Sequence, residues 1–272
     1  MAKWLTEKMG PPFIVKNKPG AGNTIGTEAV VTGQPDGYTT LFVNPIHGTN
    51  ASQYKKLNFN VIRDIAPVAG LVRTPNVMVV TNRLPVKTVA EFTIYSKTNP
   101  GKVNVASSGS GTSPYLSDNL FKSMTGCNML HVPYKGAGPA LIDSIGGQVQ
   151  VFFDNPPSSA SHITDGSIRA VRFTSTAREP SMPDVSTISE TVAGYEAAAW
   201  FGIGVPKGSP CEAIDKINAH VNRAPADPSM RVRLAELGGV PIGGSPEEFG
   251  NVIADETAKW ARVVAASGAT VD

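Results

Sequence analysis

The stretch Val105-Ala106-Ser107-Ser108-Gly109-Ser110-Gly111-Thr112-Ser113-Pro114 runs from apolar residues through a glycine-rich turn into the start of a helix. Its first residues have the Val and Ala content of the end of a short buried strand. After the turn, Leu116, Leu120 and Met124 repeat every four residues, as the buried side of a helix does. A strand that turns directly into a helix is the repeating unit of a parallel sheet, so this stretch indicates an α/β fold.

The same alternation of apolar runs and helical patterns continues from the first residues to about residue 200. Most of the runs are short and rich in Val, Ile and Phe, as strands covered on both faces are. We therefore predict an α/β fold of mostly parallel sheets flanked by helices. From about Pro206 the strand pattern stops and three helical segments follow, the last of them near Pro246 to Ala266. The predicted strands are Phe13 to Val15, Thr39 to Val43, Val77 to Thr81, Val103 to Ala106, Val149 to Phe153 and Ala170 to Thr174.

Two lobes are expected, because 272 residues exceed the roughly 100–200 residues of one domain. No long linker joins them, so strands must cross between them. The apolar runs Pro75 to Val80 and Trp200 to Pro206 are flanked by breakers and fit this role. We predict a discontinuous first lobe of residues 1–80 with 201–272, and a second lobe of residues 81–200.

The charges argue against nucleic acid as a partner, because 24 Lys and Arg are scattered among 22 Asp and Glu and give a net charge of +2. No apolar stretch approaches the roughly 20 residues of a membrane span, and the start, Met1 to Lys8, lacks the apolar core of a signal peptide. Cys127 and Cys211 leave two alternatives open, one disulfide or two free thiols.

The glycine-rich turns predict anion sites. At a helix start, unpaired N–H groups and the positive end of the helix dipole point at the same place. In the turn quoted above, Pro114 suits the first helical position and leaves Thr112 or Ser113 to cap. The segments Val15 to Gly26 and His131 to Pro139 have the same layout, and the latter adds the positive charge of Lys135.

An isolated turn of this kind is explained by a tight strand-to-helix connection. Three such turns in one chain favour ligand binding instead. Neither of the first two fits a nucleotide motif, because Gly20-Ala21-Gly22 lacks the third glycine and no Gly-Lys-Ser/Thr ends either loop.

Enzyme motifs are mostly missing from the sequence, with one exception. Ser52-Gln53-Tyr54-Lys55 matches the Ser-x-x-Lys of penicillin-recognising enzymes, and Ser117-Asp118-Asn119 matches their second motif. The third motif, Lys-Thr-Gly, does not follow. We therefore expect a protein that is not an enzyme, without cofactor, and keep a serine hydrolase of this type as a lesser alternative.

Polar residues outside the turns give fewer signals. His47, His131, His162 and His220 have no metal-ligand spacing and are expected to be surface or hydrogen-bonded side chains, so we expect no metal site. Asp154 follows a buried strand, where open α/β sheets bind ligands. It is either a ligand contact or a helix cap.

At these turns the chain resembles the extracytoplasmic solute receptors of tripartite tricarboxylate transporters, called the Bug family, over essentially its whole length. The motifs that carry the resemblance are Asn17-Lys18-Pro19-Gly20-Ala21-Gly22, Pro35-Asp36-Gly37-Tyr38-Thr39, Tyr54-Lys55-Lys56-Leu57, Asn99-Pro100-Gly101-Lys102, Gly109 to Ser113, His131 to Gly136, Phe153-Asp154-Asn155 and Trp200-Phe201-Gly202.

The resemblance implies a two-lobed periplasmic-binding fold (type II-like) that closes around a small carboxylate for uptake by a tripartite tricarboxylate transporter. It also implies a periplasmic location, membrane subunits of the transporter as partners and a monomer. The ligand-binding residues expected from the turns and the resemblance are Gly20, Ala21, Gly22, Asn23, Ser108, Gly109, Ser110, Gly111, Thr112, Ser113, Lys135 and Asp154.

The chain departs from the family pattern in three ways. The family begins with a signal peptide, a first strand and a Gly-Gly loop, whereas this chain begins inside the following helix, so part of the site is expected to be missing. Tyr115 stands where the family commonly has His. Arg172 stands where a small apolar residue is usual, and it needs a partner or a solvent-facing register.

Two alternatives share this fold: a carboxylate sensor that signals to a partner, and a truncated weak binder. The sequence does not name the ligand either. Citrate, a dicarboxylate, an aromatic acid and an amino acid all remain open, because recognition through backbone groups leaves few side chains to decode.

Overall fold

The chain forms two compact units in the computed structural model, which describes residues 1–18, 20–54, 56–179, 182–236 and 238–267. Pro19 and Lys55, quoted in the motifs above, lie outside the described residues. The first unit comprises Met1–Arg73 and Trp200–Arg262, and the second comprises Thr74–Ala199 with the end of the last helix. The chain thus passes into the second unit after Arg73 and returns after Ala199.

The first unit contains a four-stranded sheet in the order β1-β8-β2-β9. Its strands are β1 Leu41–Val43, β2 Ile65–Pro75, β8 Ala198–Pro206 and β9 Val240–Gly243. The pairs β1/β8 and β2/β9 are antiparallel. Its helical elements are α1 Ala2–Met9, η1 Ala21–Asn23, α2 Thr24–Val31, α3 Pro45–Gln53, α4 Val61–Asp64, α9 Cys211–Arg223, η3 Ala224–Ala226, α10 Pro228–Glu236 and α11 Pro246–Ser267, which extends into the second unit.

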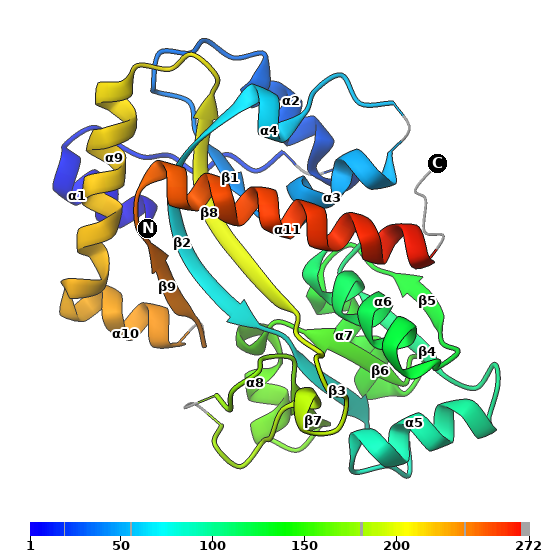
Figure 1. The fold of residues 1–272 in the computed structure, drawn as a ribbon. Helices are drawn as coiled ribbons and strands as arrows, with labels where there is room; N and C mark the ends of the chain where they lie inside the picture. Colours follow the sequence, from blue (N-terminus) through cyan, green and yellow to red (C-terminus); the bar gives the residue numbers. More distant parts are fainter. Residues whose placement is uncertain (19, 55, 180–181, 237, 268–272) are drawn as a thin grey trace. The chain divides into compact units, whose positions relative to one another are not determined.

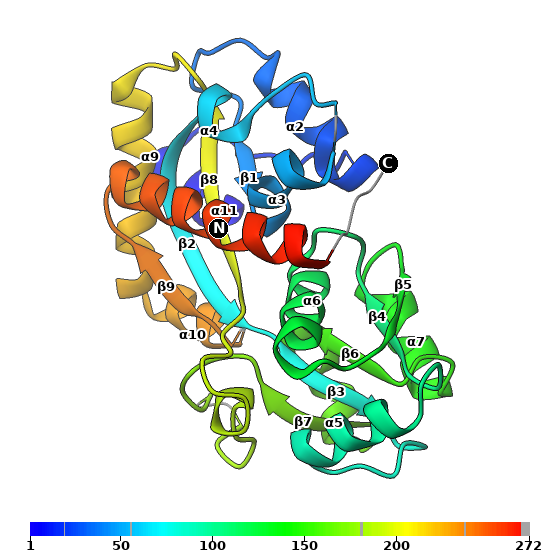
Figure 2. The same cartoon turned by 45° about the vertical axis from the view of Figure 1, so that its right-hand side comes forward.

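Two hydrophobic clusters involve this sheet. Phe249 and Ile253 of α11 share one cluster with Trp200 of β8, and α11 crosses β8 and β2 in both ribbon views (Figures 1 and 2). The second cluster joins Trp4 of α1 and Ile217 of α9 to residues of β2. Burial of these large side chains, each worth about 1.5–3 kcal/mol, holds the helices on the sheet.

The second unit contains a five-stranded sheet in the order β5-β4-β6-β3-β7. Strand β4 runs parallel to β5 and β6, whereas β3 runs antiparallel to β6 and β7. Its strands are β3 Val77–Thr81, β4 Asn104–Ser107, β5 Leu130–Pro133, β6 Val151–Asp154 and β7 Ile168–Phe173. Its helical elements are α5 Val89–Thr98, α6 Ser113–Thr125, α7 Ala137–Gly146, α8 Pro156–Thr164 and η2 Ile188–Glu190.

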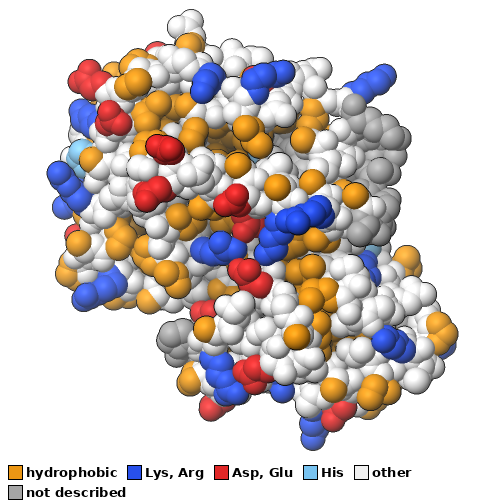
Figure 3. Space-filling view, in the orientation of Figure 1, with side chains coloured by type: hydrophobic (Ala, Val, Ile, Leu, Met, Phe, Trp, Pro, Cys, Tyr) orange, Lys and Arg blue, Asp and Glu red, His pale blue; other side chains and the backbone are white. Residues whose placement is uncertain are grey.

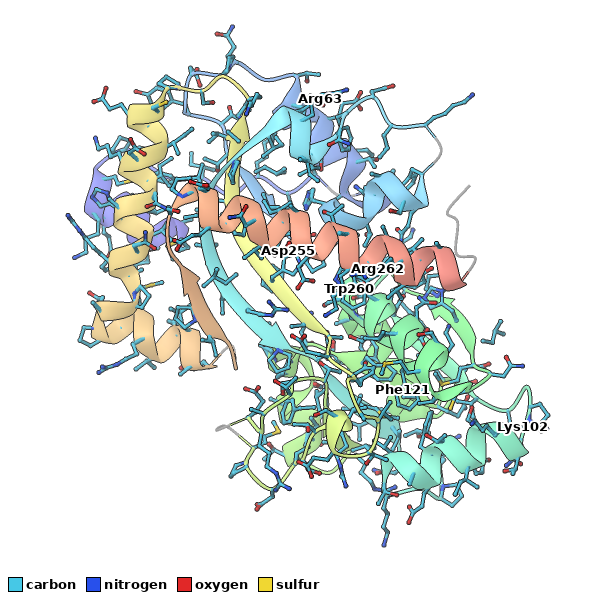
Figure 4. The ribbon with its side chains drawn as sticks, viewed as in Figure 1. Arg63, Lys102, Phe121, Asp255, Trp260 and Arg262 are labelled. Carbon is cyan, nitrogen blue, oxygen red and sulfur yellow. The ribbon has the colours of Figure 1, made fainter. Side chains whose placement is uncertain are left out.

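Helices cover both faces of this second sheet. Phe121 of α6, labelled in Figure 4, lies with its ring centroid 5.6 Å from that of Phe153 in β6. The neighbouring residue Phe152 belongs instead to the cluster of Ala140 and Leu141 in α7. Because successive strand residues point to opposite faces, α6 and α7 lie on opposite sides of β6. The Val- and Phe-rich composition of this strand follows from that double burial.

The α/β class is confirmed, but the expected mostly parallel sheets are wrong. Strand β4 pairs in parallel with β5 and β6, and helices join these three strands. Strand β3 follows β2 directly and runs antiparallel to both β6 and β7.

Two strand predictions also fail. Residues 13–15 form no strand, and Ile14 and Val15 are 84% and 71% exposed, because no described strand pairs with them. Strand β9 lies in the region predicted to be helical. Its two middle residues, Pro241 and Ile242, are too few to show the alternating apolar pattern of a strand. The three predicted C-terminal helices are confirmed as α9, α10 and α11.

The predicted lobe boundary at residue 80 differs from the observed division, because β3 pairs within the second sheet. Cys127 and Cys211 are free thiols. Arg172 is half-buried and donates from Nη1 to the carbonyl oxygen of Val171 at 2.6 Å. Lys and Arg alternate with Asp and Glu on the face drawn in Figure 3. None of the described helices combines the length and the apolar character needed to cross a membrane.

Candidate functional site

Three strand-to-helix turns meet at one edge of the second sheet. Ser107 pairs with Pro133, and Ala106 pairs with Phe152, so the parallel strands β4, β5 and β6 end side by side. The carboxyl ends of parallel strands are where open α/β sheets bind ligands. This edge brings together most of the predicted site residues, namely Ser108, Gly109, Ser110, Gly111, Thr112, Ser113, Lys135 and Asp154.

The loop between β4 and α6 is held by its own hydrogen bonds. The Gly109 N–H donates to Ser107 Oγ at 3.2 Å, and Thr112 Oγ1 donates to the Gly109 carbonyl at 2.6 Å. Thr112 is the N-cap residue of α6, yet its side chain makes no capping bond. Thr112 thus holds the expected N-cap position, but the capping bond itself is absent because the Thr112 hydroxyl is used inside the loop.

The start of α6 consequently retains free donors. Among the described residues, none accepts from the backbone N–H groups of Ser108, Ser110 and Ser113. Ser108 and Ser110 are half-buried, and Ser113 is buried. Uncapped N–H groups at the positive end of a helix are suited to a carboxylate or another small anion.

The neighbouring turn after β5 places a positive charge at the same edge. Tyr134 donates from its hydroxyl group to Asp143 Oδ2 at 2.6 Å, which ties the turn to α7. A Cβ atom on Gly109 would lie 3.6 Å from the Tyr134 carbonyl oxygen, so the two turns are in contact. Lys135 follows directly and is exposed.

Asp154 is fully buried, with one carboxylate oxygen bonded and the other free. Oδ2 accepts from the Ser158 hydroxyl at 2.5 Å, in the first turn of α8, whereas Oδ1 has no described partner. Burial raises its pKa to about 6, against the lowering effect of Ser158 and the Asn155 backbone N–H. The N-cap residue of α8 is Asn155, and the printed contact of Asp154 is with the Ser158 hydroxyl, so the helix-cap alternative is not supported. A ligand contact through Oδ1 stays a prediction.

The Gly20 to Asn23 loop belongs to the first unit and is described by itself. All four residues have positive φ angles, including 43° at Ala21 and 64° at Asn23, which non-glycine residues rarely adopt. Asn50 Nδ2 donates to the Gly22 carbonyl at 3.3 Å, and a Cβ on Gly22 would collide with the Tyr54 hydroxyl. Such strain is typical of functional loops, and ligand binding here stays a prediction.

A small cavity in the first unit was not anticipated from the sequence. It has a volume of about 40 Å³ and is lined on α3 by His47 and Asn50, and on α11 by Thr257. His47 Nε2 and Asn50 Oδ1 have no described partner. The Asn44 N–H donates to His47 Nδ1 at 3.0 Å, and burial lowers the pKa of His47 to about 4, so Nε2 carries the proton.

The described residues show little that supports enzyme chemistry. They contain no group of three or more His, Cys, Asp or Glu side chains that would hold a metal ion. Ser117 and Asp118 are fully buried inside α6, which leaves the second penicillin-recognition motif without access to a substrate.

A buried amide also escaped the sequence interpretation. Asn76 lies inside the apolar run Pro75 to Val80 and is fully buried. A polar residue within an apolar run could have indicated this role, because a buried amide must find hydrogen-bond partners. Its side chain reaches Ser113 and Asn155 at the sheet edge described above.

The comparisons with known proteins agree with this architecture. The model of the tripartite tricarboxylate transporter family receptor matches residues 1–269. Protein BugT of Bordetella pertussis is 33% identical, with 99% of this chain and 83% of that protein covered.

Two solved structures are similar over nearly the whole chain. "R. palustris Rpa4515 with adipate" is 36% identical with a TM-score of 0.93, covering 98% of this chain and 90% of that one. "MatC (Rpa3494) from Rhodopseudomonas palustris with bound malate" is 29% identical with a TM-score of 0.88, covering 97% and 91%.

Proposed function

Because the chain belongs to the tripartite tricarboxylate transporter receptor family, we propose that it captures a small carboxylate at the edge formed by β4, β5 and β6. The observation that carries this proposal is the uncapped start of α6, where Ser108, Ser110 and Ser113 keep free backbone N–H groups. Directed N–H bonds to a carboxylate are stronger than neutral hydrogen bonds, and the helix dipole adds about 0.3–1 kcal/mol.

Adipate and malate in the two similar structures support this class of ligand. Both are dicarboxylates, so one carboxylate can bind at the start of α6 while the rest of the molecule contacts other residues. The exposed Lys135 at the same edge adds a favourable charge. We propose a dicarboxylate as the ligand class.

Ligand binding is tested by thermal unfolding and titration calorimetry with adipate, malate and citrate. Dimethyl adipate is the matched control, because it keeps the chain length and removes both charges. A ligand at about 100 times its Kd stabilises the native state by roughly 2.7 kcal/mol. Stabilisation by a diacid and not by its diester is expected, whereas no response to any carboxylate would remove the proposal.

Delivery to the membrane subunits of a tripartite tricarboxylate transporter is the second part of the proposal. The family name supports it, and structures titled as periplasmic binding proteins support a periplasmic location. We propose a monomer that is not an enzyme. Uptake of labelled ligand by vesicles that contain the membrane subunits, with and without this protein, separates delivery from sensing. Light scattering measures the oligomeric state.

A further inference from the structure

We propose that the side-chain amide of Asn155 donates a hydrogen bond to the ligand carboxylate, and that Asn76 is the buried positioning residue that holds this amide. The inference rests on the proposed carboxylate-binding function and deepens it. It adds a side-chain donor to a site otherwise built from backbone N–H groups.

Asn155 lies at the edge where the free donors of α6 are found. It follows β6 directly, is half-buried and is the N-cap residue of α8. Its Oδ1 lies 3.4 Å from the hydroxyl oxygen of Ser113, the first residue of α6. The Asn155 amide is therefore in contact with the first residue of α6.

The sequence of α8 removes the backbone donors that such a turn would otherwise offer. The helix begins with Pro156 and Pro157, which have no N–H group. The Ser158 N–H is already bonded to the Asn155 carbonyl. The Asn155 side chain makes no capping bond, so a ligand at this turn meets that side chain instead of the backbone.

The orientation of the Asn155 amide is fixed through its oxygen. Asn76 Nδ2 donates to Asn155 Oδ1 at 3.1 Å, and Ser113 Oγ donates to the same oxygen at 3.4 Å. An amide oxygen has two lone pairs, so both are used. Nδ2 has no acceptor among the described residues and points to the opposite side of the planar amide.

Asn76 is held in one orientation by its own partners. Its Oδ1 accepts from Ser117 Oγ at 3.2 Å, and its backbone N–H donates to Thr174 Oγ1 at 2.7 Å. A flipped Asn76 amide would place its oxygen against Asn155 Oδ1, with an acceptor facing an acceptor, and the hydrogen bond between the two side chains would be lost. The bonded orientation of Asn76 is therefore favoured over the flipped one.

The first test is Asn155→Asp, which keeps the shape, removes both N–H donors and adds a negative charge beside the ligand. The control is Asn104→Asp, because Asn104 is also half-buried but begins β4 at the opposite end of the sheet. We expect calorimetry with adipate or malate to show about 100-fold weaker binding for Asn155→Asp and less than about 2-fold for the control. Equal losses in both variants would overturn the inference.

The second test observes the amide directly by NMR. The two side-chain amide signals that vanish in Asn155→Asp identify Asn155, and in the wild type they are expected to shift when adipate or malate is added. Signals that stay fixed at saturation would overturn direct contact.

The positioning role of Asn76 is tested by a double-mutant cycle. Asn76→Leu removes the bond to Asn155 Oδ1, so Asn155→Asp should cause at least about 10-fold less loss of affinity in that background. Additive losses would overturn the role of Asn76. If Asn76→Leu does not fold, the Asn155 amide signals in the wild type decide instead: slow hydrogen exchange supports a fixed amide, and exchange as fast as in a peptide overturns it.

The two proposals fail in different ways. A wild-type protein that binds no carboxylate removes the proposed function together with this inference. A wild-type protein that binds, with Asn155→Asp no weaker than Asn104→Asp, removes the inference alone.

Discussion

The hydroxyl oxygen of Ser107 lies 2.6 Å from Nε2 of His131, across the parallel pair β4 and β5. Burial, with a smaller contribution from Lys122, lowers the pKa of His131 to about 4, so its imidazole is neutral at pH 7. Tyr115 covers the ring edge to face at a centroid distance of 4.8 Å. The Ser107 hydroxyl therefore bonds to His131 while it accepts from the Gly109 N–H at the start of the candidate ligand loop.

We expect His131→Leu to lower the free energy of unfolding by about 1–3 kcal/mol, because the buried Ser107 hydroxyl loses its hydrogen-bond partner. Ser107→Ala in the same background should cost less than it does alone, since both partners are then apolar. Urea unfolding of the two single variants and the double variant measures this. Fully additive values would contradict a coupled pair.

Gly111→Val is expected to abolish carboxylate binding. Gly111 has a φ of 79°, which a β-branched residue adopts only with strain, so the loop that carries the free N–H groups must change shape. Gly101→Val is the matched control, because Gly101 has a φ of 75°, open space around its Cα atom and a position remote from the loop sequence. Calorimetry should show unchanged affinity for the control. Unchanged affinity for both would exclude this loop as the site.

Asp154→Asn should become more stable relative to the wild type as the pH rises. The folded pKa of about 6 exceeds the ordinary 3.8, so Asp154 stabilises the fold below pH 3.8, and that contribution is lost as the pH rises through 6. Asparagine does not ionise, so the difference between variant and wild type should change by about 2–3 kcal/mol between pH 4 and pH 7.

Urea unfolding at the two pH values tests this prediction. Asp165→Asn is the control, because hydrogen bonds from Ser167 lower the pKa of Asp165 and give the opposite sign. If the difference in free energy of unfolding between Asp154→Asn and the wild type did not depend on pH, the raised pKa of Asp154 would be contradicted.

Glu256→Gln tests the interaction that ties β2 to α11. Arg73 Nη2 and Trp260 Nε1 each lie 2.7 Å from a Glu256 carboxylate oxygen, and Glu256 is buried. Loss of the charge should lower the free energy of unfolding by about 1–3 kcal/mol. Glu236→Gln removes the exposed partner of Arg233 and should change the free energy of unfolding by less than about 0.5 kcal/mol. If both variants lowered the free energy of chemical unfolding equally, the burial of Glu256 would add nothing to the strength of its interactions.

Nitrocefin is expected to remain intact in the presence of the purified protein. Ser52 lies on α3, whereas the Ser117-Asp118-Asn119 motif is buried in α6 and cannot assist a substrate held at Ser52. An absorbance assay tests this. Hydrolysis that persists through purification and disappears in Ser52→Ala would establish the hydrolase alternative.

The sequence by itself determined the α/β class, because apolar runs and helical stripes report burial through local periodicity. The helices near Leu116 and Phe249 and the turn at Gly109 to Ser113 follow from spacing, glycine and proline alone. The family was equally accessible, since its motifs are short and contiguous. The ligand-binding assignments stay predictions.

Only the tertiary structure decided which segments are neighbours. The run at Ile14 and Val15 has strand composition but no described strand to pair with, and β3 has the expected burial but runs against β6. Asn76 and Asn155 meet although 79 residues separate them. Local periodicity records how deeply a residue is buried, whereas hydrogen-bond partners and strand direction depend on contacts between distant segments.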